Sequence, residues 1–181
     1  MRADPVISFI PARNATRLDR AVGIHKLVDY IINNSDMFSV AAEFLVECYC
    51  PGDAWNKYQQ MVAIGEPIDA KLPGLVCDAL STKEDGQEVN IGEIRGKILE
   101  VYLARLLRRF YGDDAVVHCR RFVAIDEWIS PKEVDVLSWH VNRIGEFYEC
   151  KIDPTIRTTA HLLEEYINNQ NEISRRFPVR R

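Results

Sequence analysis

Two short apolar segments separated by a polar break constrain the fold of this 181-residue chain more than any other feature. Residues 133–141 (EVDVLSWHV) are rich in Val, Leu and Trp, and residues 147–152 (FYECKI) carry aromatic and apolar groups. The intervening run Asn142-Arg143-Ile144-Gly145 has the composition of a turn. This pattern predicts two antiparallel strands joined as a β-hairpin.

The register of this hairpin decides which polar side chains meet. Side chains alternate along a strand, so Glu149 and Lys151 share one face of the second strand. Asp135 joins that face if the loop has three or five residues centred near Asn142 or Arg143, whereas a two-residue turn there would place it on the opposite face. With the centre at Asn142, Asp135 lies directly opposite Glu149.

Such a pairing would create a site for a divalent cation. Two carboxylates close together repel each other unless a cation lies between them, and Mg²⁺ prefers oxygen ligands. We therefore expect Asp135, Glu149 and the backbone carbonyl of Cys150 to be metal ligands. Lys151 would be a positive charge beside the metal, able to stabilise charge that develops during a reaction. The alternative is a surface hairpin with ordinary charge pairs.

A long amphipathic segment precedes the hairpin. The spacing of apolar residues predicts a helix over 91–111 that ends at Gly112, with Leu99, Leu103, Leu106 and Phe110 as its apolar stripe. Glu100 lies at the margin of this stripe. A carboxylate turned halfway towards a core is explained either by a metal site or by a side chain that reaches back to solvent.

The order of a helix with Glu100, a strand, a strand with Asp135, a strand with Glu149-Cys150-Lys151 and a second helix resembles the catalytic core of the PD-(D/E)XK nuclease superfamily. The resemblance covers roughly residues 91–176, and the hairpin looks most like the archaeal resolvase and Mrr-type restriction branches. Val134 stands where the superfamily often has proline. The resemblance implies that Asp135, Glu149 and Glu100 bind Mg²⁺, with Mn²⁺ as a substitute, and that Lys151 assists the attack of water on a phosphodiester.

The predicted fold class follows from this order. We expect an α/β protein with a restriction-endonuclease-like mixed sheet flanked by helices, and with a helical N-terminal region. Apolar residues at helical spacing occur in the segments 18–33, 37–50 and 53–64. We therefore divide the chain into a helical N-terminal region, 1–90, and a nuclease-like core, 91–181. Structural support is the simplest role of the first region; a DNA clamp and a dimer surface also fit.

Charge and cysteine content limit the function classes. The net charge is −4, but residues 1–90 hold 8 basic and 13 acidic groups, whereas residues 91–181 hold 15 and 14. Arginines of the second region, among them Arg120, Arg121, Arg143 and Arg157, are candidates for contacts with DNA phosphates. The alternative is a solvated surface of mixed charge. Five cysteines without a Cys-x-x-Cys pair favour reduced thiols, and no apolar run approaches the roughly 20 residues that a membrane span needs. These features indicate a soluble, cytoplasmic protein without a membrane partner.

The leading prediction is therefore a Mg²⁺-dependent endodeoxyribonuclease whose catalytic residues are Asp135, Glu149, Lys151 and Glu100. A nuclease that cuts both strands of a duplex with one active site per chain is expected to act as a homodimer. The alternative is a non-catalytic member of the same fold that binds nucleic acid or supports an assembly.

Overall fold

The computed structural model describes residues 6–12, 18–84, 86–140, 145–150 and 160–176 of the chain. These residues form two compact units. A helical unit contains the described residues from 18 to 106. A sheet unit contains residues 6–12, the described residues from 107 to 150, and residues 160–176 of the C-terminal helix. The division falls within one long helix, and not at residue 90, where the sequence pattern places the boundary.

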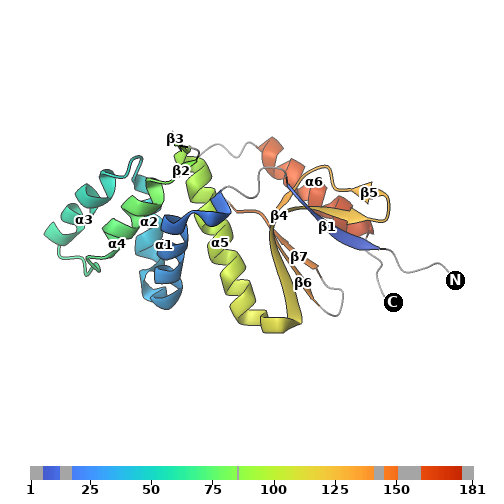
Figure 1. Ribbon diagram of the computed structural model, residues 1–181, viewed down its shortest axis with the longest axis horizontal. Coiled ribbons are helices and arrows are strands. Elements are labelled where there is room, and N and C mark those ends of the chain that lie inside the picture. Colours follow the sequence, from blue (N-terminus) through green and yellow to red (C-terminus); the bar gives the residue numbers. More distant parts are fainter. Residues whose placement is uncertain (1–5, 13–17, 85, 141–144, 151–159, 177–181) are drawn as a thin grey trace. The chain divides into compact units, whose positions relative to one another are not determined.

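The helical unit packs four helices and most of a fifth around one apolar core (Figure 1). Its elements are η1 (Leu18–Arg20), α1 (Val22–Asn33), η2 (Ser35–Met37), α2 (Phe38–Glu47), α3 (Asp53–Ala63), α4 (Leu72–Leu80), the short strands β2 (Lys83–Glu84) and β3 (Gln87–Glu88), and α5 (Ile91–Tyr111) as far as Leu106. Ile24, Phe44 and Leu72 are fully buried in its core. The helical N-terminal segments predicted from periodicity are thus present, and the polar stretch before α5 holds a small antiparallel hairpin.

Helix α5 has the bounds that the sequence predicts. It ends before Gly112, whose φ of 57° is a conformation that glycine adopts without strain. The predicted apolar stripe is wrong, however, because Phe110 is 80% exposed and the buried positions are a different set. The buried apolar residues of α5 are Ile94, Ile98, Val101, Ala104 and Leu107.

One buried cation of α5 explains part of this difference. The guanidinium of Arg95 donates through Nη2 to the carbonyls of Val46 and Cys48, at 2.9 and 3.0 Å. These carbonyls lie at the C-terminal end of α2, where a positive charge is favourable. Arg95 is therefore buried because it caps another helix, which periodicity alone does not reveal.

The sheet unit is built on an antiparallel sheet with one helix packed against it. Its strands are β1 (Ile7–Pro11), β4 (Ala115–Ile125), β5 (Trp128–Ile129), β6 (Val134–His140) and β7 (Gly145–Tyr148); η3 (Gly112–Asp114) precedes β4, and α6 (Ala160–Arg176) follows β7 in the chain. The strand order is β1-β4-β6-β7, with β5 paired to β4. All described pairings are antiparallel, whereas we expected a mixed sheet. The coarser prediction of helices combined with a sheet is confirmed.

Strand β1 is the longest strand that the sequence analysis missed. Ile7 pairs with Ile125 and Pro11 with Arg121, so residues near the start of the chain form one edge of the sheet. The apolar core of this unit contains Val123, Leu137 and Ile173, with Ile173 contributed by α6. The side chain of Gln170 in α6 also donates to the carbonyl of Phe147, at 3.3 Å.

None of the helices in the described part of the chain is long and apolar enough to cross a membrane.

Candidate metal site on the hairpin

Asp135 lies in β6 between two buried valines, and its own side chain is half-buried. The backbone N–H of Cys150 donates a hydrogen bond of 2.8 Å to Oδ2 of Asp135. This contact holds the segment that follows β7 beside the carboxylate. Residues 149 and 150 therefore remain next to β6 after the regular strand pairing has ended.

The hairpin register agrees with the loop centre at Asn142. Val136 pairs with Tyr148 and Ser138 with Glu146, so each pair of opposed residues is symmetric about position 142. One further step of the same register would bring Asp135 opposite Glu149, the first residue after β7. Opposed residues of an antiparallel pair lie on the same face, so the metal-site prediction requires that the register continue by this step.

Of the other two members of the predicted motif, the structure describes Cys150 and not Lys151. Cys150 is 4% exposed, so its carbonyl belongs to a sheltered part of the hairpin. Lys151 lies outside the described residues. Its role as the charge beside the metal stays a prediction.

The donor chemistry fits Mg²⁺. Mg²⁺ is usually held by one or two carboxylates and keeps several waters, so Asp135, Glu149 and the Cys150 carbonyl would be a sufficient protein contribution. Within the described ranges, no group of three or more His, Cys, Asp or Glu side chains is placed to hold a metal ion. The hairpin ligands would therefore depend on water to complete the coordination.

Glu100 is positioned by the helical unit. Its side chain is 10% exposed, and Oε2 accepts a hydrogen bond of 3.0 Å from Nζ of Lys97. Lys97 also forms an ion pair with Asp19. Burial opposes the charge on Lys97, but Glu100 and Asp19 outweigh it and raise the pKa of the lysine. Because Glu100 and Asp135 belong to different units, the sharing of one metal by these two residues stays a prediction.

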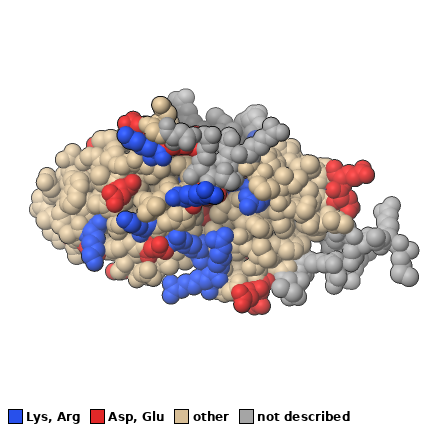
Figure 2. Space-filling model, in the orientation of Figure 1, with Lys and Arg blue, Asp and Glu red and all other residues tan. Residues whose placement is uncertain are grey.

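The predicted DNA-contacting arginines are only partly described. Arg120, at a φ of 48°, pairs with Glu133, with 2.7 Å between Nη2 and Oε1. Nη1 of Arg121 donates to the carbonyls of Cys119 and Arg120. Arg143 and Arg157 lie outside the described residues. On the face drawn in Figure 2, basic and acidic side chains are interspersed rather than gathered by sign.

A polar cluster on the hairpin escaped the sequence analysis. Oε2 of Glu146 accepts a hydrogen bond of 2.7 Å from Ser138, and Oε1 accepts one of 2.9 Å from the hydroxyl of Tyr111. His140 Nε2 lies 3.2 Å from Oε2, and Tyr148 also donates to this carboxylate. The hydrogen bond from Ser138 is the main reason that the pKa of Glu146 is lowered. Burial and the nearby Glu146 charge raise the pKa of Tyr148 to about 12.

This cluster contains the residue types of a serine-hydrolase triad but lacks its geometry. A triad histidine uses one ring nitrogen for the serine and the other for the acid. Here Nε2 of His140 is 3.2 Å from both Ser138 Oγ and Glu146 Oε2. Ser138 is fully buried, and its hydroxyl donates a hydrogen bond to Glu146. A nucleophilic role for Ser138 is therefore excluded by its burial and by its hydrogen bond.

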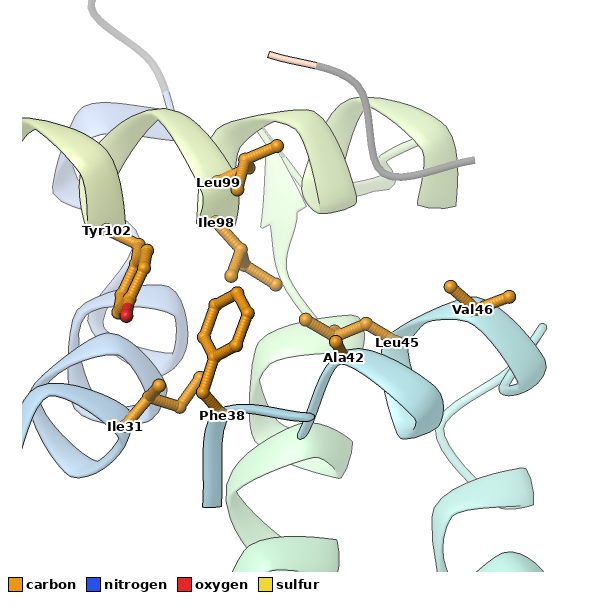
Figure 3. Close-up of a pocket in the computed structure, with 8 residues that line it drawn as sticks. All are labelled: Ile31, Phe38, Ala42, Leu45, Val46, Ile98, Leu99 and Tyr102. Atoms are coloured by element: carbon orange, nitrogen blue, oxygen red, sulfur yellow. The ribbon is translucent and has the colours of Figure 1, made fainter. Parts of the chain in front are cut away.

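The helical unit also contains an apolar pocket of about 180 Å³ (Figure 3). Phe38 projects into it and stacks on Tyr102, with 5.0 Å between ring centroids. The remaining lining residues are aliphatic: Ile31, Ala42, Leu45, Val46, Ile98 and Leu99. The Tyr102 hydroxyl is the one polar side-chain group among these lining residues. The pocket therefore offers little with which to orient a substrate.

Comparisons of the chain with protein-family models, with curated proteins and with solved structures found no match.

Proposed function

We propose that the protein is a Mg²⁺-dependent endodeoxyribonuclease whose reaction centre is the β6–β7 hairpin. The observation that supports the proposal is the hairpin register, which is symmetric about position 142 as far as Val136 and Tyr148; its next step would set Asp135 opposite Glu149. The hydrogen bond from the Cys150 amide to Asp135 supports it, because it keeps the following segment beside Asp135. The resemblance to the PD-(D/E)XK core assigns a hydrolytic use to this same set of residues.

In this proposal, Asp135, Glu149 and the Cys150 carbonyl hold the cation. When bound, Mg²⁺ would supply Lewis-acid chemistry and an acidified water. The Cys150 amide fixes the orientation of the Asp135 carboxylate. Lys151 provides a positive charge for the phosphate oxygens, on which negative charge accumulates as water attacks phosphorus. Glu100 is an assisting carboxylate.

Cleavage of supercoiled plasmid DNA in Mg²⁺ or Mn²⁺ tests the proposal. The informative variants are Asp135→Asn, Glu149→Gln and Lys151→Ala; Asp113→Asn, an exposed aspartate of η3, is the matched control. We expect each hairpin variant to lose activity by at least about 100-fold, a magnitude typical of losing a charge that stabilises the transition state. The control should cleave as the wild type does.

Equal cleavage by all variants would assign the activity to a contaminant. DNA binding without metal-dependent cleavage by the wild type would instead favour the non-catalytic nucleic-acid-binding module. A calorimetric titration with Mn²⁺ separates the two readings, since the nuclease requires a cation site that Asp135→Asn and Glu149→Gln weaken.

A further inference from the structure

Glu146 lies at the centre of the hydrogen bonds on one face of the hairpin. Its cross-strand partner is Ser138, which donates to it at 2.7 Å. Tyr111, at the end of α5, donates to the other carboxylate oxygen at 2.9 Å, and the ring of Tyr111 packs edge-on against His140 with 4.2 Å between centroids. The carboxylate therefore joins β6, β7 and α5 at one point.

On the opposite face of the hairpin, a residue of β6 packs closely against a residue of β7. Trp139 pairs with Gly145, and a Cβ atom at position 145 would lie 2.9 Å from two ring carbons of Trp139. The indole thus occupies the space that any other residue at 145 would need. This fit prevents Trp139 from lying opposite a larger residue, but it supplies no directional bond.

A register shift would separate the metal ligands. Shifting the pairing by one residue moves every side chain of one strand to the other face relative to its neighbour. Asp135 would then lie opposite Cys150 or Tyr148, and Glu149 would point to the other side of the sheet. In the same shift Ser138 would lose Glu146, which would leave a fully buried hydroxyl without its acceptor.

We propose that Glu146 is a positioning residue that fixes the hairpin register in which Asp135 and Glu149 share one face. The proposal rests on the proposed metal-dependent nuclease function. Glu146 itself contacts neither metal nor substrate; it acts through Ser138 and Tyr111. The β7 strand spans only Gly145–Tyr148, so few main-chain bonds set the register, and a side-chain bond between opposed residues adds to its specificity.

The test compares Glu146→Leu and Glu146→Gln with Glu127→Leu, an exposed glutamate of a turn in the same unit. Cross-strand nuclear Overhauser effects between β6 and β7 report the register without reference to any metal. Calorimetric titration with Mn²⁺ reports the cation site. We expect Glu146→Leu to lose the wild-type cross-strand pattern and to bind Mn²⁺ about 10- to 100-fold more weakly, as when a residue supporting a metal ligand is removed.

Glu146→Gln is the rescue variant, because its amide oxygen can still accept from Ser138. It should keep the wild-type pattern and bind Mn²⁺ more tightly than Glu146→Leu does. If Glu146→Leu does not fold, Ser138→Ala is the substitute, because it removes the same cross-strand bond with little change in volume. It is also expected to lose the wild-type cross-strand pattern.

The outcomes separate this proposal from the nuclease proposal. An unchanged cross-strand pattern in Glu146→Leu, or in Ser138→Ala where the former does not fold, overturns the positioning role whatever the wild type binds. A changed pattern with unchanged Mn²⁺ affinity also overturns it. A wild type that binds no Mn²⁺ refutes the nuclease proposal and with it the positioning of a metal site; the cross-strand pattern then decides only whether Glu146 sets the register.

Discussion

The backbone amide of Cys150 donates to Oδ2 of Asp135 across the hairpin, at 2.8 Å. This bond makes the carboxylate part of the fold as well as a candidate ligand. Asp135→Ala would leave the amide of a buried residue without this acceptor, whereas Asp135→Asn keeps an oxygen in the same place. We expect Asp135→Ala to lower the free energy of unfolding by about 1–3 kcal/mol relative to Asp135→Asn. Urea denaturation measures this, and equal midpoints for the two variants would contradict it.

The Lys97–Glu100 pair should behave as a buried ion pair. Lys97→Met leaves Glu100 charged and buried, and removal of one partner of such a pair typically costs about 3–5 kcal/mol. Replacing both residues, as Lys97→Met with Glu100→Leu, should recover most of that loss. Chemical denaturation of the two single variants and the double variant gives the coupling energy. A double variant as unstable as Lys97→Met alone would show that the pair is not the reason for the loss.

Gly145 should not tolerate a side chain. A Cβ atom there meets the Trp139 ring at 2.9 Å, so Gly145→Ala forces the indole or the strand to move. We expect a loss of about 1–3 kcal/mol, the usual cost of overpacking. Gly96→Ala is the matched control, because it lies within α5 and a Cβ there meets nothing within 4 Å. The control should gain about 0.5–1 kcal/mol from helix propensity. Thermal unfolding of both variants tests the contrast.

Two neighbouring cysteines should differ in reactivity. Cys48 is fully buried, and burial raises the pKa of its thiol to about 11, whereas Cys50 is exposed. Because the thiolate is the reactive form, Cys50 should be alkylated by iodoacetamide well before Cys48 in the folded protein at pH 8. Peptide mass spectrometry over a time course measures the order, with urea-unfolded protein as the control in which both react. Faster labelling of Cys48 would show that α2 does not pack as described.

The Glu146 cluster should give the protein an acid-sensitive contribution to stability. The Ser138 hydrogen bond lowers the pKa of Glu146 below its ordinary value of 4.5. A lowered pKa in the folded state means that the contribution is fully present above pH 4.5 and is lost as the pH falls through the folded value. Glu146→Gln should flatten the dependence of the unfolding midpoint on pH below about 5. If the unfolding midpoints of wild type and Glu146→Gln depend on pH in the same way under acidic conditions, the carboxylate charge does not contribute to stability.

The hairpin was predictable because a single local choice, the centre of the loop, fixes every opposed pair. Alternation and turn composition limited the centre to Asn142 or its neighbourhood without choosing among the possible registers, and the observed pairing of Val136 with Tyr148 has its centre at Asn142. Helix α5 and a strand between it and the hairpin were also predictable, because their patterns are local and Gly112 separates them.

Other features depend on partners distant in sequence and left no local signal. The pairing of Ile7 with Ile125 cannot be inferred from either segment alone. The burial of Arg95 and Lys97 depends on carbonyls of α2 and on Asp19, so periodicity chose the wrong face of α5 and placed Phe110 inside. Glu146 lay between the predicted turn, 142–145, and the predicted second strand, 147–152, and was assigned to neither, although its position four residues from the loop centre placed it opposite Ser138.

Strand β1 has a practical consequence for fragments of this protein. A fragment that begins at residue 91 would lack β1, so the β4 groups that bond it would become an open edge next to apolar Val123 and Ile125. Open edges of this kind recruit strands from other molecules. If such a fragment self-associates, the contact is expected to be pairing between exposed β4 edges. It should not be mistaken for the homodimer that double-strand cleavage would need.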